Sequence, residues 1–305
     1  MKDKILVTGA NGNLGKKFML SKGEVDVCAL VRSEKAKNDL MNFVQAHDIQ
    51  DIQIVKCDYL DEQVIKELAR SCTYVLHLVG IIKENKDNRF DVVHKQTTKA
   101  LVAAIKGSGI KKCCYLSILG AKEGSENTCF SSRGLAEKLF LDSDIPSLVL
   151  QVPMVLGEGD YACEALKKNA LSRFNFTFRK LSLEQPIYAG DIIDAIKLDI
   201  SRTLKGDYSP SGIKALAGPT SLTRERLIIR VAKQLGVKVK VCSIPLFLGY
   251  AFARIFEILF SHPPITTAML GVLDHDDDID PLPSCNELGI KLTTLDSMLE
   301  TTISP

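Results

Sequence analysis

The sequence lacks a surplus of charge of either sign. Its 305 residues contain 39 Lys and Arg against 37 Asp and Glu, a formal net charge of +2, and no run of Lys or Arg is longer than two. A protein that neutralises nucleic-acid phosphates needs concentrated positive charge, so we expect no nucleic-acid partner. The 46% hydrophobic and 25% charged residues are typical of a globular protein and exclude disordered, collagenous and coiled-coil chains.

Paired metal-ligating or redox residues are also lacking. The nine cysteines contain no C-x-x-C pair, and the five histidines never fall three or four positions apart. We therefore expect no metal site. The opening residues 1–4 lead directly into the short apolar run 5–7, which is too short for a secretory apolar region. These features predict a protein of the reducing cytoplasm.

A long uninterrupted apolar run is absent as well. Residues 244–260 come nearest, but Arg254 and Glu257 interrupt them well short of the roughly 20 apolar residues that span a bilayer. We favour a buried or half-buried helix. The alternatives are a helix that lies on a membrane surface, meets a membrane-associated protein partner, or lines a lipophilic pocket.

What the first two-thirds of the chain does contain is a regular alternation of short apolar runs and helical patterns. Continuous apolar strands separated by helices indicate a parallel sheet covered on both faces. We expect strands at residues 4–8, 26–31, 52–56, 74–78, 113–117 and 147–152. We expect the intervening helices at residues 14–22, 34–46, 61–72, 90–106 and 132–142.

Beyond Pro153 the pattern loosens. We expect helices at 162–171, 191–205 and 223–235, a strand at 237–241, and a Gly/Ser/Pro-rich connection at 206–218. The fold class predicted is α/β, a doubly wound parallel Rossmann sheet of order 3-2-1-4-5-6 with a small C-terminal mixed cap. Residues 1–160 would form the dinucleotide-binding core. Residues 161–305 would form the cap or substrate region, interleaved with the last elements of the core.

A glycine-rich segment follows the first expected strand and opens the first expected helix. Gly9, Gly12 and Gly15 stand three apart, rather than in the G-x-G-x-x-G spacing of the common dinucleotide fingerprint. Gly9 permits a tight turn, Gly12 lets backbone N–H groups approach a pyrophosphate, and Gly15 lets helix and strand pack closely. The helix N-terminus would attract the phosphates. The whole loop therefore predicts cofactor contacts from Gly9, Asn11, Gly12, Asn13, Leu14 and Gly15.

The second strand ends at Arg32 and Ser33. A carboxylate at this place would accept hydrogen bonds from the adenosine ribose, whereas an arginine suits a 2′-phosphate. We therefore favour NADP(H) as the cofactor, with NAD(H) as the alternative. A solvent-exposed arginine, or one that only stacks on adenine, remains the other interpretation.

These segments together resemble an extended or atypical short-chain dehydrogenase/reductase. The branch that looks most similar contains the nucleotide-binding accessory subunit of respiratory complex I, with NmrA-like proteins nearby. The resemblance covers nearly the whole chain and is sharpest over residues 4–160. It is carried by residues 8–15, 30–32, 57–58, 78–80, 93–104, 151–153, 157–160, 185–188, 190–192 and 288–290.

The resemblance implies further residue roles. Asp58 would bind the adenine amino group, and Leu78, Val79 and Gly80 would line the path of the adenosine and nicotinamide ribose. Pro153, after the sixth strand, would also contact the cofactor. Ser117 stands where these enzymes place a substrate-polarising hydroxyl and would touch the cofactor too; a hydroxyl that only bonds its own loop is the alternative.

The sequence departs from the family where the chemistry would occur. Active members carry a Tyr four residues before a Lys, and the pair passes a proton during hydride transfer. Alignment on residues 134–137 puts Cys129 at the Tyr position and Arg133 at the Lys position. Arg133 could hold ribose hydroxyls, but its charge is permanent, so it cannot relay a proton. Cys129 is a candidate acid, although a small apolar filler is the favoured interpretation.

Two other features have ordinary interpretations. The acidic stretch 275–280 lacks the spacing and glycine of a calcium loop, and we expect it to be solvated. His77 falls inside an apolar strand and is expected to be a packed core residue.

Three functions follow from these patterns. The first is a dinucleotide-binding protein of the complex I accessory type, in which NADP(H) stabilises the fold rather than turns over. The second is an NAD(P)H-dependent reductase or epimerase for a lipophilic or quinone-like substrate. The third is a redox-sensing regulator of the NmrA kind. Whether the protein is an enzyme therefore stays open, and a peripheral position at a membrane surface is compatible with each.

Overall fold

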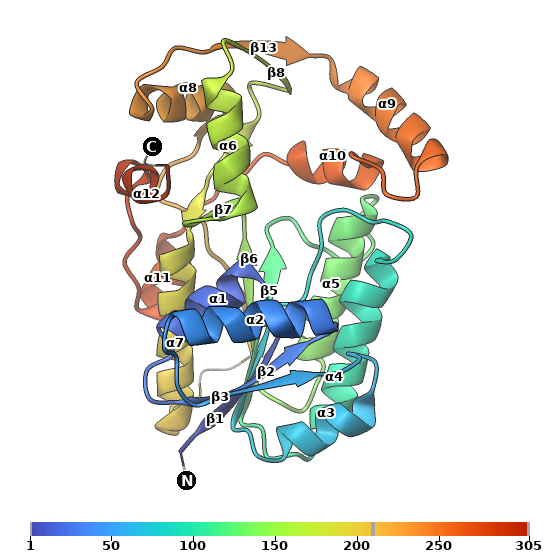
Figure 1. Ribbon diagram of the computed structural model, residues 1–305, viewed down its shortest axis with the longest axis vertical. Helices are drawn as coiled ribbons and strands as arrows, with labels where there is room; N and C mark the ends of the chain where they lie inside the picture. The colour runs from blue at the N-terminus through green and yellow to red at the C-terminus, as the bar shows by residue number, and fades with distance from the viewer. Residues whose placement is uncertain (1, 209–210, 304–305) are drawn as a thin grey trace.

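The structure, a computed structural model, describes residues 2–208 and 211–303. Seven parallel strands form its central sheet in the order β11-β6-β5-β4-β1-β2-β3 (Figure 1). The predicted doubly wound Rossmann sheet is confirmed, with β11 as an added edge strand. The strands are β1 Lys4–Thr8, β2 Asp26–Val31, β3 Ile52–Lys56, β4 Tyr74–His77, β5 Lys112–Ile118, β6 Ser147–Val152 and β11 Gly212–Ala215.

Helices cover both faces of this sheet (Figure 1). One face carries α1 Asn13–Leu20, α2 Glu34–Ala46 and α7 Ala189–Leu204. The other carries α3 Glu62–Ala69, the π-helical turn Asp91–Gln96 that leads into α4 Thr97–Ile105, and α5 Thr128–Leu141. Because both faces are buried, the central strands need apolar residues at every position, which explains their continuous apolar runs.

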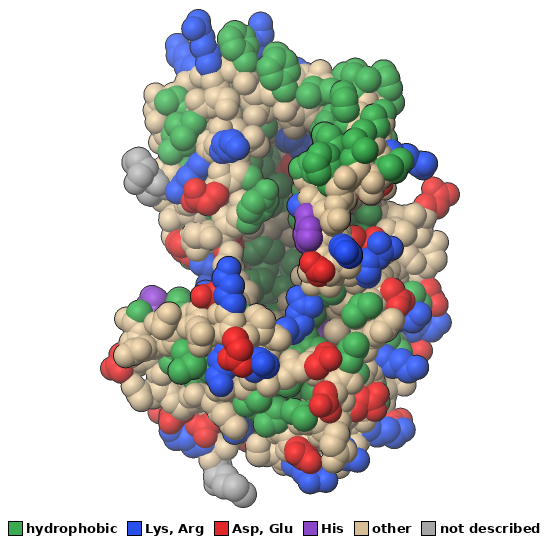
Figure 2. Space-filling model, turned by 45° about the vertical axis from the view of Figure 1, so that its right-hand side comes forward, with side chains coloured by type: hydrophobic (Ala, Val, Ile, Leu, Met, Phe, Trp, Pro, Cys, Tyr) green, Lys and Arg blue, Asp and Glu red, His purple; other side chains and the backbone are tan. Residues whose placement is uncertain are grey.

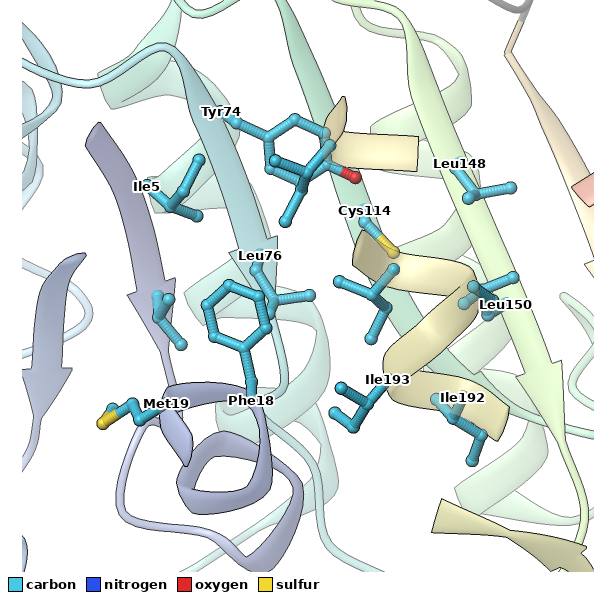
Figure 3. Close-up of a cluster of buried hydrophobic side chains, with 14 of the residues drawn as sticks. Ile5, Phe18, Met19, Tyr74, Leu76, Cys114, Leu148, Leu150, Ile192 and Ile193 are labelled. Carbon is cyan, nitrogen blue, oxygen red and sulfur yellow. The ribbon is translucent and has the colours of Figure 1, made fainter. Parts of the chain in front are cut away.

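A cluster of buried hydrophobic side chains fills the space between the sheet and helices α1 and α7. Phe18 of α1 and Ile193 of α7 lie near Leu76 of the central strand β4, with Met19 and Ile192 at the sides of the same cluster (Figure 3). All of these side chains are buried. Since α7 comes from the second half of the chain, both halves contribute to this core.

The C-terminal lobe lies beyond the carboxyl ends of the strands (Figure 1). Its buried cluster joins α6, α8, β13 and α12. Its small strands are β7 Val155–Leu156, β8 Phe174–Phe178, β9 Leu183–Glu184, β10 Ile187–Tyr188, β12 Leu222–Thr223 and β13 Lys240–Ile244. Its helices are α6 Tyr161–Leu171, α8 Arg224–Gln234, α9 Leu246–Leu259, α10 Thr267–Leu273 and α12 Leu295–Thr302. Helix α11 Leu282–Leu288 returns to the sheet domain, where it packs beside α7 (Figure 1).

Several predicted boundaries are wrong. Helix α5 begins at Thr128 rather than 132, because the Asn127 side chain caps it by accepting from the amides of Cys129 and Phe130. The last strand, β13, begins at Lys240 rather than 237 and pairs with β8. Part of the expected connection 206–218 is strand β11, which extends the sheet beside β6.

The interpretation of 244–260 as a buried or half-buried helix is wrong as well. In α9 only Gly249 and Ala253 are buried, while Phe247 and Ile258 are 69% and 83% exposed. Small residues face the protein and large apolar residues face outward. Within the described residues, no helix has the length and apolar character needed to cross a bilayer.

Candidate functional site

The glycine loop connects β1 to α1 at the carboxyl edge of the sheet. Gly9 has a φ of +73°, and a Cβ there would lie 2.9 Å from the carbonyl carbon of Leu78. Gly15 is buried, and a Cβ there would collide with the backbone of Ala10. Gly12 differs, because a Cβ there would meet only the Gly9 oxygen, at 3.2 Å, and otherwise open space. The loop therefore has a tight turn, a close helix contact, and an open side at Gly12.

Tyr59, which no sequence motif singled out, holds this loop to the sheet. Its hydroxyl accepts from the Gly9 amide at 2.9 Å and donates to the Leu30 carbonyl at 2.7 Å. Burial raises the pKa of Tyr59 to about 12, so the phenol keeps its proton. Tyr59 follows Asp58 directly in the sequence. An aromatic residue shortly after the end of β3 is the only sequence feature that could have indicated this role.

The predicted adenosine-binding residues lie at the ends of β2 and β3. The Arg32 guanidinium is exposed and donates to Asn88 Oδ1 at 3.0 Å. Ser33 caps α2 by accepting from the Ala36 amide, and the Asp58 side chain accepts from the Leu60 amide. The Ser33 and Asp58 side chains therefore already serve local turns, whereas Arg32 is positioned by a loop that follows β4.

A cavity of about 510 Å³ lies between the sheet edge and the C-terminal lobe (Figure 2). This volume is in the range of small-molecule sites. Four predicted site residues line it: Leu78, Ser117, Arg133 and Pro153. The glycine loop, Arg32 and Asp58 do not line it, but Gly9 packs against the backbone of Leu78, which does. We call the predicted site residues at these strand ends the strip. The far wall is largely apolar and comes from α6, α8, α10 and the start of α9.

Ser117 is buried at the end of β5, and its hydroxyl donates to Glu137 Oε1. Gln151 Nε2 donates to both Glu137 oxygens at 3.0 Å. Burial raises the pKa of Glu137, which the hydrogen bonds from Ser117 and Gln151 partly offset. While Glu137 is ionised, the Ser117 proton is engaged and cannot polarise a substrate. A protonated Glu137 would donate to Ser117 instead and free the hydroxyl hydrogen.

Cys129 and Arg133 lie one turn apart on α5, and Arg133 lines the cavity whereas Cys129 does not. Cys129 is fully buried, its thiol donates to the Ile81 carbonyl at 3.7 Å, and burial raises its pKa to about 11. Arg133 Nη1 donates to the Leu116 carbonyl at 2.9 Å. A Cβ at Gly80 would collide with the Arg133 guanidinium, so the glycine at that position makes room for the arginine.

Two buried histidines, His94 and His77, lie near Arg133. His94 lies in the π-helical turn, where its Nε2 accepts from the Ile81 amide and its Nδ1 contacts the Ser132 hydroxyl. His77 contacts the hydroxyls of Thr8 and Thr98. Burial lowers the pKa of His94 to about 2 and of His77 to about 3. Both are neutral packing residues, as predicted for His77.

The acidic stretch 275–280 is not simply solvated, which corrects the expectation. His275 and Asp277 line the cavity, and His275 Nδ1 lies 3.0 Å from Asp277 Oδ1. The His275 ring packs edge-on against Phe130, next to Cys129, and a Cβ at Gly120 would lie 2.7 Å from its Nε2. The hydrogen bond to Asp277 raises the pKa of His275. This pair can carry a proton at the cavity wall.

Among the described residues, no group of three or more His, Cys, Asp or Glu side chains is arranged to hold a metal ion. The nine cysteines are free thiols, and all except Cys242 are buried. The ionisable side chains that line the cavity include Arg133, His275 and Asp277.

Comparison with known proteins finds a family model that matches the glycine loop and the strands around it. Residues 1–151 match the NmrA-like family. This match spans the sheet from β1 to β6, the glycine loop, Ser117 and Arg133. The resemblance predicted from the sequence is confirmed.

Curated relatives extend the similarity beyond the NmrA-like match. The chain is 22% identical over 297 residues to the mitochondrial NADH dehydrogenase [ubiquinone] 1 alpha subcomplex subunit 9 of Mus musculus, with 95% of this chain and 77% of the relative covered. The corresponding protein of Arabidopsis thaliana is 25% identical, with 72% and 55% covered. A ceramide reductase of Caulobacter vibrioides is 23% identical over 51% of this chain and 47% of the relative.

Solved structures share the fold across the whole chain. A UDP-glucuronic acid 4-epimerase from Bacillus cereus, in complex with UDP-glucuronic acid and NAD, has a TM-score of 0.71 at 18% identity, with 98% of each chain covered. A nucleoside-diphosphate-sugar epimerase from Staphylococcus aureus has a TM-score of 0.71 at 17% identity, with 98% and 100% covered. The likeness of fold to these structures therefore extends beyond residue 151 into the C-terminal lobe.

Proposed function

We propose that this chain binds NADP(H) along the strand ends and holds a lipophilic molecule in the adjoining cavity, without the family's Tyr/Lys proton relay. In this proposal residues 1–160 are the dinucleotide-binding core and residues 161–305 the cap. The observation that carries the proposal is the close approach of the Gly9 turn to Leu78, a residue that lines the apolar cavity. The bound dinucleotide stabilises the fold or reports the redox state, and we do not expect it to be oxidised or reduced rapidly.

The residues present fit a dinucleotide. Two buried polar atoms on the strip, Asn11 Oδ1 and Arg133 Nε, have no hydrogen-bond partner in the described part of the chain. Unpartnered buried groups of this kind call for a ligand or water. Gly12 caps α1, whose N-terminal amides attract phosphate. When bound, the dinucleotide would supply a hydride; Gly12, Asn11 and Arg133 would hold its phosphates and ribose.

The cavity favours a lipophilic molecule over a sugar nucleotide. The two arginines of its C-terminal wall already have acidic partners: Arg179 pairs with Asp274, and Arg224 pairs with Glu184 at 2.6 Å. A diphosphate needs uncompensated cations. The remaining wall is mainly aliphatic, which suits a hydrocarbon or quinone-like ring. Such molecules reside in membranes, so we propose a peripheral position there.

The dinucleotide site is tested with Gly12→Val. The branched side chain would fill the space where the phosphates must approach. We expect binding of NADPH to weaken on the order of 100-fold or more, about 2.7 kcal/mol, in isothermal titration calorimetry.

Gly212→Val is the matched control for this variant. Gly212 lies in β11, away from the site, and a Cβ there meets nothing within 4 Å. It should keep wild-type affinity. A Gly12→Val protein with an unchanged circular dichroism spectrum and unchanged NADPH affinity would refute the proposed dinucleotide site.

The preference for NADP(H) is tested with Arg32→Ala. A charge-assisted hydrogen bond to the 2′-phosphate contributes about 1.5–3 kcal/mol. We expect roughly a 10- to 150-fold loss of NADPH affinity and little change for NADH. Lys35→Ala, at an exposed position in α2, is the control for loss of one positive charge. Equal affinity of the wild type for the two cofactors would contradict the preference.

A second candidate function is an NAD(P)H-dependent reductase or epimerase, and the His275–Asp277 pair favours it. This pair lines the same cavity as Ser117 and Arg133, and the hydrogen bond to Asp277 raises the pKa of His275, which favours the protonated imidazole. A histidine of this kind can act as a general acid. It would replace the missing tyrosine from a loop of the cap that packs against Phe130, the neighbour of Cys129.

A further inference from the structure

The outer surface of the C-terminal lobe carries a continuous apolar face. It combines the exposed side of α9 with the outer side of the two-stranded β8–β13 sheet, and Figure 2 shows hydrophobic side chains gathered in this upper part of the molecule. We call it the α9 face. Its exposed members are Phe174, Phe176, Phe247, Leu248, Phe252, Ile255, Ile258, Leu259 and Phe260.

Helix α9 is amphipathic in the reverse of the usual sense. Gly249 and Ala253, four residues apart, are its buried positions, and Gly249 packs against the Phe178 ring of β8. Phe247, Ile255 and Ile258 recur at helical spacing on the opposite side and are 69%, 49% and 83% exposed. A surface helix normally turns its large apolar residues inward. An outward apolar stripe of this size marks a docking surface.

The β8–β13 sheet continues the same face. Phe174 and Phe176 alternate with the buried Asn175, so they share the outer side of the strand. Lys240 lies directly opposite Phe174 in the register, and the Arg173 guanidinium lies 5.9 Å from the centre of the Phe174 ring. Aromatic rings with long basic side chains beside them are typical of a membrane interface.

Charge identifies the occupant. Residues 161–178 and 237–260, which form the α9 face and its border, contain six Lys or Arg against Glu164 and Glu257, hence +4, whereas the whole chain carries +2. Of these six, Arg173, Lys240 and Arg254 lie on the elements of the α9 face itself or directly beside its rings, and Lys238 is two residues from Lys240. A second copy docked through the same face would bring like charges together. An anionic lipid surface is complementary to both the apolar face and its basic border.

We infer that the α9 face binds the surface of an anionic lipid bilayer. Docking in this way brings the cavity close to the bilayer, because Leu246 at the start of α9 and Phe178 of β8 both line the cavity wall. A lipophilic molecule could then pass from the bilayer into the cavity. This last step rests on the proposed function, whereas the docking does not.

The test is co-sedimentation of the full chain with phospholipid vesicles. We expect at least about tenfold stronger binding to phosphatidylcholine vesicles with about 30 mol % phosphatidylglycerol than to pure phosphatidylcholine. Ile255→Ser combined with Ile258→Ser should weaken binding to anionic vesicles at least about tenfold. Lys238→Gln combined with Lys240→Gln should reduce the preference for anionic vesicles.

Ile229→Ser on α8 is the matched control, since Ile229 is an exposed isoleucine that is not part of the α9 face. It should bind vesicles as the wild type does. The Ile255/Ile258 variant should also keep wild-type NADPH affinity, so that loss of vesicle binding and failure of the dinucleotide site are told apart. No sedimentation of a folded wild-type chain with either vesicle would overturn the inference. So would a wild-type dimer that the Ile255/Ile258 variant dissociates in light scattering.

Discussion

Lys112→Met is expected to lower the free energy of unfolding by about 3–5 kcal/mol, because it leaves a buried carboxylate without its cation. Lys112 Nζ lies 2.7 Å from Asp199 Oδ1, and the two side chains are 1% and 5% exposed. The Tyr74 hydroxyl donates to the other Asp199 oxygen at 2.6 Å. One neutral hydrogen bond cannot replace an ion pair in this environment. Chemical denaturation followed by circular dichroism measures the loss.

Lys111→Met is the control, since Lys111 is the exposed neighbour in the sequence. It should change the unfolding free energy by less than about 0.5 kcal/mol. The double variant Lys112→Met/Asp199→Leu should recover part of the loss, because it removes both charges together. If Lys112→Met were as stable as Lys111→Met, the buried pair would not be an important part of this core.

The Rossmann half could be predicted because its information is local. Each central strand is an apolar run, each crossover a helical pattern, and the glycine loop stands between them. The order of the strands then follows from the family resemblance, and β1 does pair with both β2 and β4. Predicted helix boundaries were wrong where one side chain sets the start of a helix. The side chain of Asn127 caps α5, which therefore begins at Thr128. An asparagine before a helix is a common cap and could have been used to predict this start.

The candidate site could be predicted only in part, because half of its chemistry comes from distant segments. Ser117, Arg133 and Pro153 were predicted from the family resemblance, and they do line the cavity. Glu137 was used only to align the helix, although it accepts the Ser117 proton. His275 comes from a loop with no motif of its own, and only the folding of the cap brings it to Phe130. No local pattern specifies such a contact.

Helix α9 illustrates the opposite error. Its composition favoured burial, since apolar residues usually form a core. The direction of its apolar side depends on which side meets the protein, and the small residues Gly249 and Ala253 do so. The side of α9 that faces the protein depends on the tertiary contact between Gly249 and the Phe178 ring of β8. The local sequence of α9 does not show this contact. The apolar content of a segment therefore does not distinguish a core helix from a docking helix.

The wild-type protein is expected to reduce ketones with NADPH slowly. General acid–base help contributes roughly 10²–10⁴-fold, and neither residue at the relay positions can supply it. Cys129 is fully buried with a pKa of about 11, and Arg133 holds its proton permanently. We expect Cys129→Ala to leave any residual turnover within about twofold of the wild type. The measurement is NADPH oxidation with ketones, sugar nucleotides and quinones as substrates. Quinones should react fastest, because their reduction depends least on a general acid of the protein.

His275→Gln separates the two candidate functions in the same assay. The glutamine keeps a polar side chain of similar size but cannot donate an imidazolium proton. If the protein is a reductase, turnover should fall by roughly 10²-fold or more in this variant. Its wild-type rate should also decline as pH rises through the pKa of His275, because only the protonated form is an acid, and Asp277 and Asp276 move that pKa upward. Slow turnover that His275→Gln leaves unchanged supports the binding role. Fast ketone reduction that Cys129→Ala abolishes would make the buried thiol the acid and overturn both assignments.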